Sequence, residues 1–145
     1  MRRSCLVFLS TVLMLAGGCS DQARDVGIKP PPSGGAMIRL PNGRGFVAVK
    51  TELPAGSPKG KTKTRAATIV AVFYQTDGVT PMTPAPTDVV FKIGPPENAK
   101  SIALSPDAGD PSRFASLPGP YLSALQGIVH AKINGEDVEE SFSAL

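Results

Sequence analysis

Residues 66–74 read Ala-Ala-Thr-Ile-Val-Ala-Val-Phe-Tyr, a run that is apolar at nearly every position and rich in β-branched side chains. A strand with one face in solvent alternates apolar and polar residues, whereas a strand inside a sheet can be apolar on both faces. The short length and the β-branched composition favour a strand over a helix. The run therefore predicts a central strand that is buried on both sides.

Short apolar stretches separated by proline, glycine and asparagine flank this run on both sides. Their spacing is typical of antiparallel strands in an all-β sandwich. In residues 45–53 the side chains alternate, which predicts a half-buried strand whose inward face begins with Val47 and Val49. In residues 88–93 the same period places Phe91 inward. The other strands expected in this part of the chain cover 36–40, 101–104 and 113–117.

The last part of the sequence carries the clearest turn. Residues 128–133 alternate, Asn134-Gly135 suits the two positive φ angles of a type I′ turn, and residues 138–142 return. This alternation places His130 on the outer face, together with Lys132. The inward positions are Val129, Ala131 and Ile133.

Composition supports the same fold class. All 15 prolines lie after residue 18, so that about one residue in eight is proline against the usual one in about twenty, and the chain has no Trp. Residues 121–125 predict a single helical turn. We therefore predict one all-β domain over residues 36–145, an antiparallel β-sandwich of immunoglobulin-like outline with about seven or eight strands. The cysteine pair and Trp of true immunoglobulin domains are missing, and the sequence does not determine the strand order.

The first 18 residues have the three parts of a bacterial export signal. Arg2 and Arg3 supply a positive end, residues 6–15 an apolar run, and residues 16–18 (Ala-Gly-Gly) a small-residue cleavage site. A helix that crosses a membrane needs about 20 apolar residues, so this run of ten is too short to span one. Residues 1–18 are therefore expected to direct export and to be removed.

Cys19 follows this segment directly, in the sequence Leu-Ala-Gly-Gly-Cys over residues 15–19. The segment resembles the lipobox of bacterial lipoproteins, although Ala16 stands where a leucine is usual and Leu15 lies one step early. The resemblance implies that Cys19 receives a diacylglyceryl group on its sulfur and an acyl chain on its amine. The mature protein would then be held to a membrane by its N-terminal lipid.

Residues 19–35 are predicted to be a flexible tether. They carry no periodic apolar pattern, contain three prolines at 30–32 and end in Ser33-Gly34-Gly35. Ser20 follows the cysteine, where an aspartate would retain a lipoprotein at the inner membrane in enteric-type sorting. By resemblance to that rule, the expected location is the outer membrane, facing the periplasm.

Charge and side-chain chemistry exclude several classes of function. Removing Arg2 and Arg3 leaves 13 basic against 12 acidic residues, and a nearly neutral domain is a poor candidate for binding nucleic acid. With Cys19 lipidated and Cys5 removed, no thiol remains for catalysis or metal binding. His130 is the single histidine, and no Gly-x-Ser-x-Gly motif is present. We therefore expect a non-enzymatic protein without a cofactor or a metal.

Two other patterns have simpler interpretations than a ligand site. Residues 55–62 match a relaxed phosphate-binding loop, but a strand-like run follows instead of the helix that such a loop requires, so nucleotide binding is not expected. Asp107 and Asp110, with Glu97 nearby, lack the alternating acids of a calcium loop and favour a turn. Four cations at alternate positions form a candidate contact for an anionic surface, or a solvated loop: Lys59, Lys61, Lys63 and Arg65.

Short motifs spread over the mature chain, at 32–35, 87–93, 110–114 and 133–135, look like those of a group of small bacterial lipoproteins of uncharacterised function. Histidine-rich members of that group, some of which accompany heavy-metal efflux components, have a histidine before the two glycines, where this chain has Ser33. Our first hypothesis is a lipid-anchored periplasmic protein with a non-enzymatic binding or structural role in the cell envelope, acting on an envelope protein partner. The alternative is an accessory protein of a metal or small-molecule efflux system.

Overall fold

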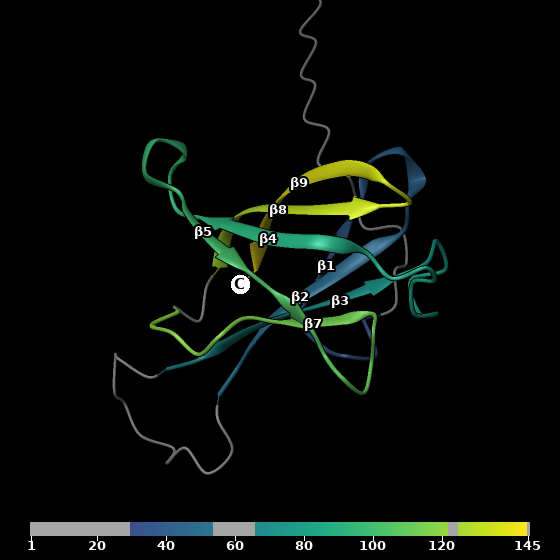
Figure 1. Cartoon of the computed structure of the whole chain (residues 1–145), viewed down its shortest axis with the longest axis horizontal. Helices are drawn as coiled ribbons and strands as arrows, with labels where there is room; N and C mark the ends of the chain where they lie inside the picture. The colour runs from purple at the N-terminus through teal and green to yellow at the C-terminus, as the bar shows by residue number, and fades with distance from the viewer. Residues whose placement is uncertain (1–29, 54–65, 122–124, 145) are drawn as a thin grey trace, which may run out of the picture.

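The computed structural model describes residues 30–53, 66–121 and 125–144. These residues form two antiparallel sheets that face each other, so the protein is an all-β sandwich (Figure 1). Two short 3-10 turns, η1 (Pro41–Gly43) and η2 (Pro96–Asn98), join strands. The strands are β1 (Ala36–Arg39), β2 (Phe46–Glu52), β3 (Thr68–Tyr74), β4 (Thr87–Ile93), β5 (Lys100–Ala103), β6 (Ser105–Pro106), β7 (Arg113–Ala115), β8 (Leu125–Ile133) and β9 (Glu136–Ala144).

The run that opens the sequence analysis becomes the middle strand of the larger sheet. The strand order there is β1-β2-β3-β7-β6, and Val47 of β2 pairs with Phe73 of β3. The second sheet has the order β5-β4-β8-β9. Both faces of β3 are buried, which confirms the prediction of a central strand.

The strand order corresponds to that of an immunoglobulin domain. Strands β2-β3-β7-β6 follow the order A-B-E-D of one immunoglobulin sheet, and β5-β4-β8-β9 follow C′-C-F-G of the other. Strand β1 is added at the edge beside β2. The predicted immunoglobulin-like outline is therefore confirmed, and the order of the strands is a new finding.

The main core lies between the two sheets. Phe73 and Phe114 meet edge to face with their ring centroids 5.6 Å apart, and Phe91 packs against Phe142 at 5.0 Å. Phe73 and Phe91 are completely buried. Contact between aromatic rings adds to the stabilisation that comes from burying their area. These pairs join β3 to β7 and β4 to β9, so each sheet places aromatic side chains in the core.

The outer face of the larger sheet is also buried, and there the prediction of a half-buried second strand is wrong. Phe46 and Ala48 alternate with the inward Val47 and Val49, yet all four are buried. Phe46 and Ala48 belong to a second apolar cluster on the outer face, which also includes Val70, Val72 and Tyr74. Met37 and Ala115 pack against it.

Eight predicted strands are present, with shifted ends. The ninth, β6, has two residues, Ser105 and Pro106, and was not among the predicted strands. The helical turn expected over 121–125 is wrong at Leu125, which begins β8, while residues 122–124 lie outside the described part. The final hairpin is confirmed: Asn134 has φ 53° and Gly135 has φ 83°, as a type I′ turn requires.

Candidate functional site

Three connections meet at one end of the sandwich. They are residues 41–45 between β1 and β2, residues 75–86 between β3 and β4, and the turn Asn134-Gly135 between β8 and β9. In the immunoglobulin correspondence, the last two are the B–C and F–G loops, which carry the binding residues of variable domains. This end of the sandwich, which we call the loop end, is therefore the first place to look for a ligand site.

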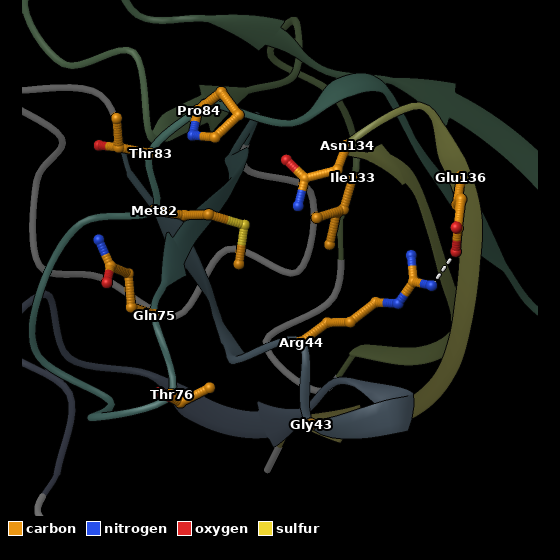
Figure 2. Close-up of a pocket in the computed structure, with 10 residues that line it drawn as sticks. All are labelled: Gly43, Arg44, Gln75, Thr76, Met82, Thr83, Pro84, Ile133, Asn134 and Glu136. Atoms are coloured by element: carbon orange, nitrogen blue, oxygen red, sulfur yellow. Dashed lines mark hydrogen bonds and ion pairs between the residues drawn. The ribbon is translucent and has the colours of Figure 1, made fainter.

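A cavity of about 410 Å³ opens at the loop end (Figure 2). This volume lies in the usual range for small-molecule sites, about 300–1,000 Å³. In Figure 2 the side chains of Met82 and Asn134 project toward the middle of the cavity, and Arg44 extends below them toward Glu136. The lining residues are Gly43, Arg44, Gln75, Thr76, Met82, Thr83, Pro84, Ile133, Asn134 and Glu136.

An ion pair crosses the rim of this cavity. The Arg44 guanidinium donates a hydrogen bond to the Glu136 carboxylate, which joins the β1–β2 connection to the start of β9. The two side chains differ in exposure, 25% for Arg44 and 67% for Glu136. The arginine is thus held against the protein, whereas its partner stands mostly in solvent.

The remaining lining groups are both polar and apolar. Met82 and Ile133 are buried and form an apolar wall. The side chains of Thr76, Thr83 and Asn134 make no hydrogen bond with any other described residue. These amide and hydroxyl groups can donate and accept hydrogen bonds at the cavity.

The backbone at the loop end is held in conformations that favour glycine and asparagine. Asn42 has φ 57° and Gly45 has φ 105°. A Cβ atom at Gly45 would lie 2.2 Å from the carbonyl oxygen of Tyr74, so no larger residue fits there without a shift of the backbone. The Leu40 amide donates to the Gly45 oxygen at 2.9 Å, which closes this connection beside the cavity.

A second cavity, of about 640 Å³, lies near the other end of the sandwich, beside the end of β4 and the start of β8. Lys92 is the charged residue of its lining, and its Nζ already contacts Glu139 at 2.6 Å. Most of the other lining residues belong to strands or to the segment 94–99. The lining at the loop end has more side chains that can form hydrogen bonds, and we therefore consider it the better candidate.

The residues that the sequence singled out as sites fall outside the described part of the chain. Cys19 lies in 1–29, and the candidate anionic-surface residues Lys59, Lys61, Lys63 and Arg65 lie in 54–65, as do all residues of the phosphate-loop match. The strand residues on either side of residues 54–65 are described. Glu52 pairs with Thr68 at the last position of the β2–β3 ladder, while Phe46 and Tyr74 pair at the loop end. The ends of β2 and β3 nearest to residues 54–65 in the sequence therefore lie opposite the cavity.

His130 lies on the outer face of the second sheet, as predicted. Its Nε2 lies 3.3 Å from an Asp137 carboxylate oxygen. Two ion pairs share this face, Lys92–Glu139 at 2.6 Å and Lys132–Asp88 at 3.3 Å. These cross-strand pairs connect β4, β8 and β9 on an exposed surface.

Asp107 and Asp110 form turns, as the sequence predicts. An Asp107 oxygen accepts from the Gly109 amide at 3.0 Å and its other oxygen pairs with Arg113, while Asp110 accepts from Ser112. The Gly109 hydrogen bond, with the nearby charge of Arg113, lowers the pKa of Asp107 below its usual value. Within the described ranges, no group of three or more His, Cys, Asp or Glu residues is arranged to hold a metal ion.

The cavity residues were not found from the sequence. Arg44 and Glu136 are 92 positions apart, and each looks like an ordinary residue next to a turn. The two Asn-Gly pairs at 42–43 and 134–135 mark the turns, but only the strand order brings those turns together. Comparison with protein-family models, curated proteins and solved structures found no match to this chain. None of the described helical segments is long and apolar enough to cross a membrane.

Proposed function

We propose that this protein is a lipid-anchored component of the bacterial cell envelope with a non-enzymatic binding role. The support for the anchor is the export-type segment 1–18 followed by Cys19 in a sequence that resembles a lipobox. Ser20 favours the outer membrane, facing the periplasm. The β-sandwich would then be held at the membrane and present its binding surface to an envelope partner.

The observation that carries the binding role is the cavity at the loop end. Its lining combines an ion pair, side-chain amides, threonine hydroxyls and an apolar wall. Such groups hold a ligand by hydrogen bonds, charge and contact, and fixed loops on a rigid sandwich are a common way to present them. We assign the binding role to the loop end for this reason.

The basic segment suits a position near the membrane. The ends of β2 and β3 lie opposite the cavity, and the sequence between them carries Lys59, Lys61, Lys63 and Arg65. Anionic lipid headgroups or wall polymers attract such a cluster of positive charge. In this arrangement the cavity would face away from the anionic surface and toward the partner.

The anchor is tested by the variant Cys19→Ser. We expect the wild-type protein to carry fatty acyl mass on its N-terminal cysteine and to fractionate with membranes. The variant should lose the acyl mass and become soluble or remain an uncut precursor. Equal membrane partitioning of both proteins after signal removal would contradict the anchor.

The binding role is tested by purifying the protein from detergent-solubilised envelope after cross-linking. We expect a stoichiometric protein partner whose recovery falls when Thr76 and Thr83 at the cavity are both replaced by alanine. A matched control replaces the exposed residues Val79 and Leu117, which do not line the cavity. Recovery of a metal instead of a protein would favour the efflux accessory over the proposed role.

A further inference from the structure

We propose that the loop-end cavity binds a carboxylate carried beside an apolar group, and that Arg44 exchanges Glu136 for the carboxylate of the ligand. This inference rests on the proposed binding role and specifies its ligand chemistry. Its basis is that four groups line one cavity. They are the largely buried guanidinium of Arg44, the exposed carboxylate of Glu136, the side-chain amide of Asn134 and an apolar wall.

Arg44 is presented from a fixed position. It directly follows η1, where its amide donates to the Pro41 oxygen at 3.3 Å, and the next residue, Gly45, accepts the Leu40 amide. Its side chain is about three-quarters buried. A planar guanidinium matches the two oxygens of a carboxylate and loses little freedom when it is already oriented. Arg44 is therefore prepared to receive a carboxylate at the cavity rim.

Glu136, the present partner of the Arg44 guanidinium, is weakly held. Its side chain is 67% exposed, and it begins β9 immediately after the hairpin turn. Exposed ion pairs contribute little to stability because solvent screens them and both side chains lose freedom. A ligand carboxylate can therefore replace Glu136 at small cost, so Glu136 acts as an internal competitor of the ligand.

The rest of the cavity selects what lies beside the carboxylate. Met82 and Ile133 supply an apolar wall on the inner side, suited to an aliphatic group. The Asn134 amide projects toward the middle of the cavity, where its NH₂ can donate to the second ligand oxygen (Figure 2). Among the described lining residues Arg44 is the one cation, and Glu136 would repel a dianion, so a single carboxylate fits better than a phosphate.

The chemistry is shared by two sources, a free small acid and the C-terminal residue of a peptide. N-acetyl-leucine is the simplest probe, and N-acetyl-leucinamide differs from it only in the carboxylate. We expect titration calorimetry with the soluble Cys19→Ser protein to detect the acid and not the amide. A peptide ending in leucine that binds more tightly than N-acetyl-leucine would identify the source as a chain terminus, and equal or weaker binding would identify a free acid.

Three variants distinguish this proposal from nonspecific binding. Arg44→Gln should weaken binding of N-acetyl-leucine by about ten- to a hundredfold, because it removes a charged hydrogen bond. Glu136→Gln should strengthen binding by about two- to fivefold, because it removes the competing charge. Arg39→Gln, at an exposed arginine in β1 outside the cavity lining, should leave binding unchanged. Thermal melts of each variant check that the domain remains folded.

The proposal is overturned if the acid and the amide bind equally, if neither binds, or if Glu136→Gln weakens binding as much as Arg44→Gln does. The proposed function has a separate outcome. A protein partner that is lost on alanine replacement of Thr76 and Thr83, in a protein that binds no carboxylate, would retain the binding role of the loop end and reject this ligand.

Discussion

The backbone amide of Ser33 donates a hydrogen bond to the phenol oxygen of Tyr74 at 3.3 Å. Lys50 reinforces the contact from β2, where its Nζ donates to the Ser33 oxygen at 2.6 Å. Pro31 is buried, and its oxygen accepts the Gly34 amide in a tight turn. The chain is thus bonded to the outer face of the larger sheet before β1 begins, so the predicted tether of residues 19–35 contacts the domain over its last residues.

Replacing Tyr74 by phenylalanine should loosen this contact without emptying the outer cluster. The ring remains, but the Ser33 amide loses its acceptor. We expect faster hydrogen exchange at Ser33 and a loss of about 1 kcal/mol or less in the free energy of unfolding. Exchange measured by NMR on the folded domain tests the first expectation, and urea unfolding tests the second.

Tyr121 provides the matched control for this experiment. Its hydroxyl donates to the Leu117 oxygen at 3.2 Å in an exposed position. Tyr121→Phe should leave exchange at Ser33 unchanged. If Tyr74→Phe also leaves it unchanged, the Ser33 amide is not hydrogen-bonded to Tyr74 in solution.

Phe73 is the residue whose loss should damage the sandwich most. It is fully buried between the sheets and meets Phe114 edge to face. Truncation of a buried phenylalanine to alanine costs about 3–5 kcal/mol, a large part of the stability of a typical domain. Urea unfolding of Phe73→Ala measures this cost. The exposed Val79→Ala should stay within about 0.5 kcal/mol of wild type, and similar losses for both variants would place Phe73 outside the core.

Glu52 should contribute an acid-dependent part of the stability. The hydrogen bond from Lys50 lowers the pKa of Glu52 below its ordinary value of 4.5, burial opposes this shift, and the charge of Arg113 adds to it. A carboxyl group whose pKa falls on folding stabilises the folded state above its unfolded pKa. This contribution is lost as the pH falls below about 4.5 and through the lowered value. The side chain is 38% exposed, so screening keeps the effect to about 1 kcal/mol or less.

The variant Glu52→Gln tests this dependence. It should be less stable than wild type at pH 7, and the difference should shrink as the pH is lowered below 4.5. Urea unfolding at pH 7, 5, 4 and 3 follows the difference directly. Glu97→Gln, at an exposed residue in η2, serves as the control. A constant difference between Glu52→Gln and wild type across this range would show that ionisation of Glu52 does not support the fold.

The sequence predicted the parts of this fold that local chemistry determines. Residues 66–74 have the composition of a strand buried on both faces, and Asn134-Gly135 meets the backbone requirement of a type I′ turn by itself. The burial of Phe46 and Ala48 was missed because a strand with alternating residues looks half-exposed when nothing shows that Met37 packs over its outer face. Strand β6 was missed because two residues carry no period.

The candidate site depends on contacts that no local pattern contains. Arg44 and Glu136 pair only because β1 and β9 lie at neighbouring edges of the two sheets. The packing of the two sheets also brings Met82, in the loop of residues 75–86, to this cavity. Strand order arises from pairing between distant segments, which sequence periodicity does not specify. The turns could therefore be predicted, whereas their meeting at one end could not.

The pairing of β4 with β8 in the second sheet depends on Gly127. It lies in β8 opposite Ile93 of β4, and a Cβ atom there would stand 2.0 Å from the Lys92 carbonyl oxygen. The obstacle is backbone, so only a shift of one strand could relieve the clash. Gly127→Ala should therefore destabilise the domain by about 1–3 kcal/mol, the cost typical of overpacking, as measured by urea unfolding.

Gly109→Ala is the matched control for this substitution. The nearest atom to its added Cβ would be an Asp107 side-chain oxygen at 3.7 Å, an ordinary contact, so the stability should change by no more than about 0.5 kcal/mol. The two substitutions add the same methyl group and differ only in what it meets. If Gly127→Ala is as stable as Gly109→Ala, β4 and β8 do not pair in the register that sets Ile93 against Gly127. Cross-strand contacts such as His130–Asp137, which lie between β8 and β9, would then persist while the β4 pairs Lys92–Glu139 and Lys132–Asp88 would not.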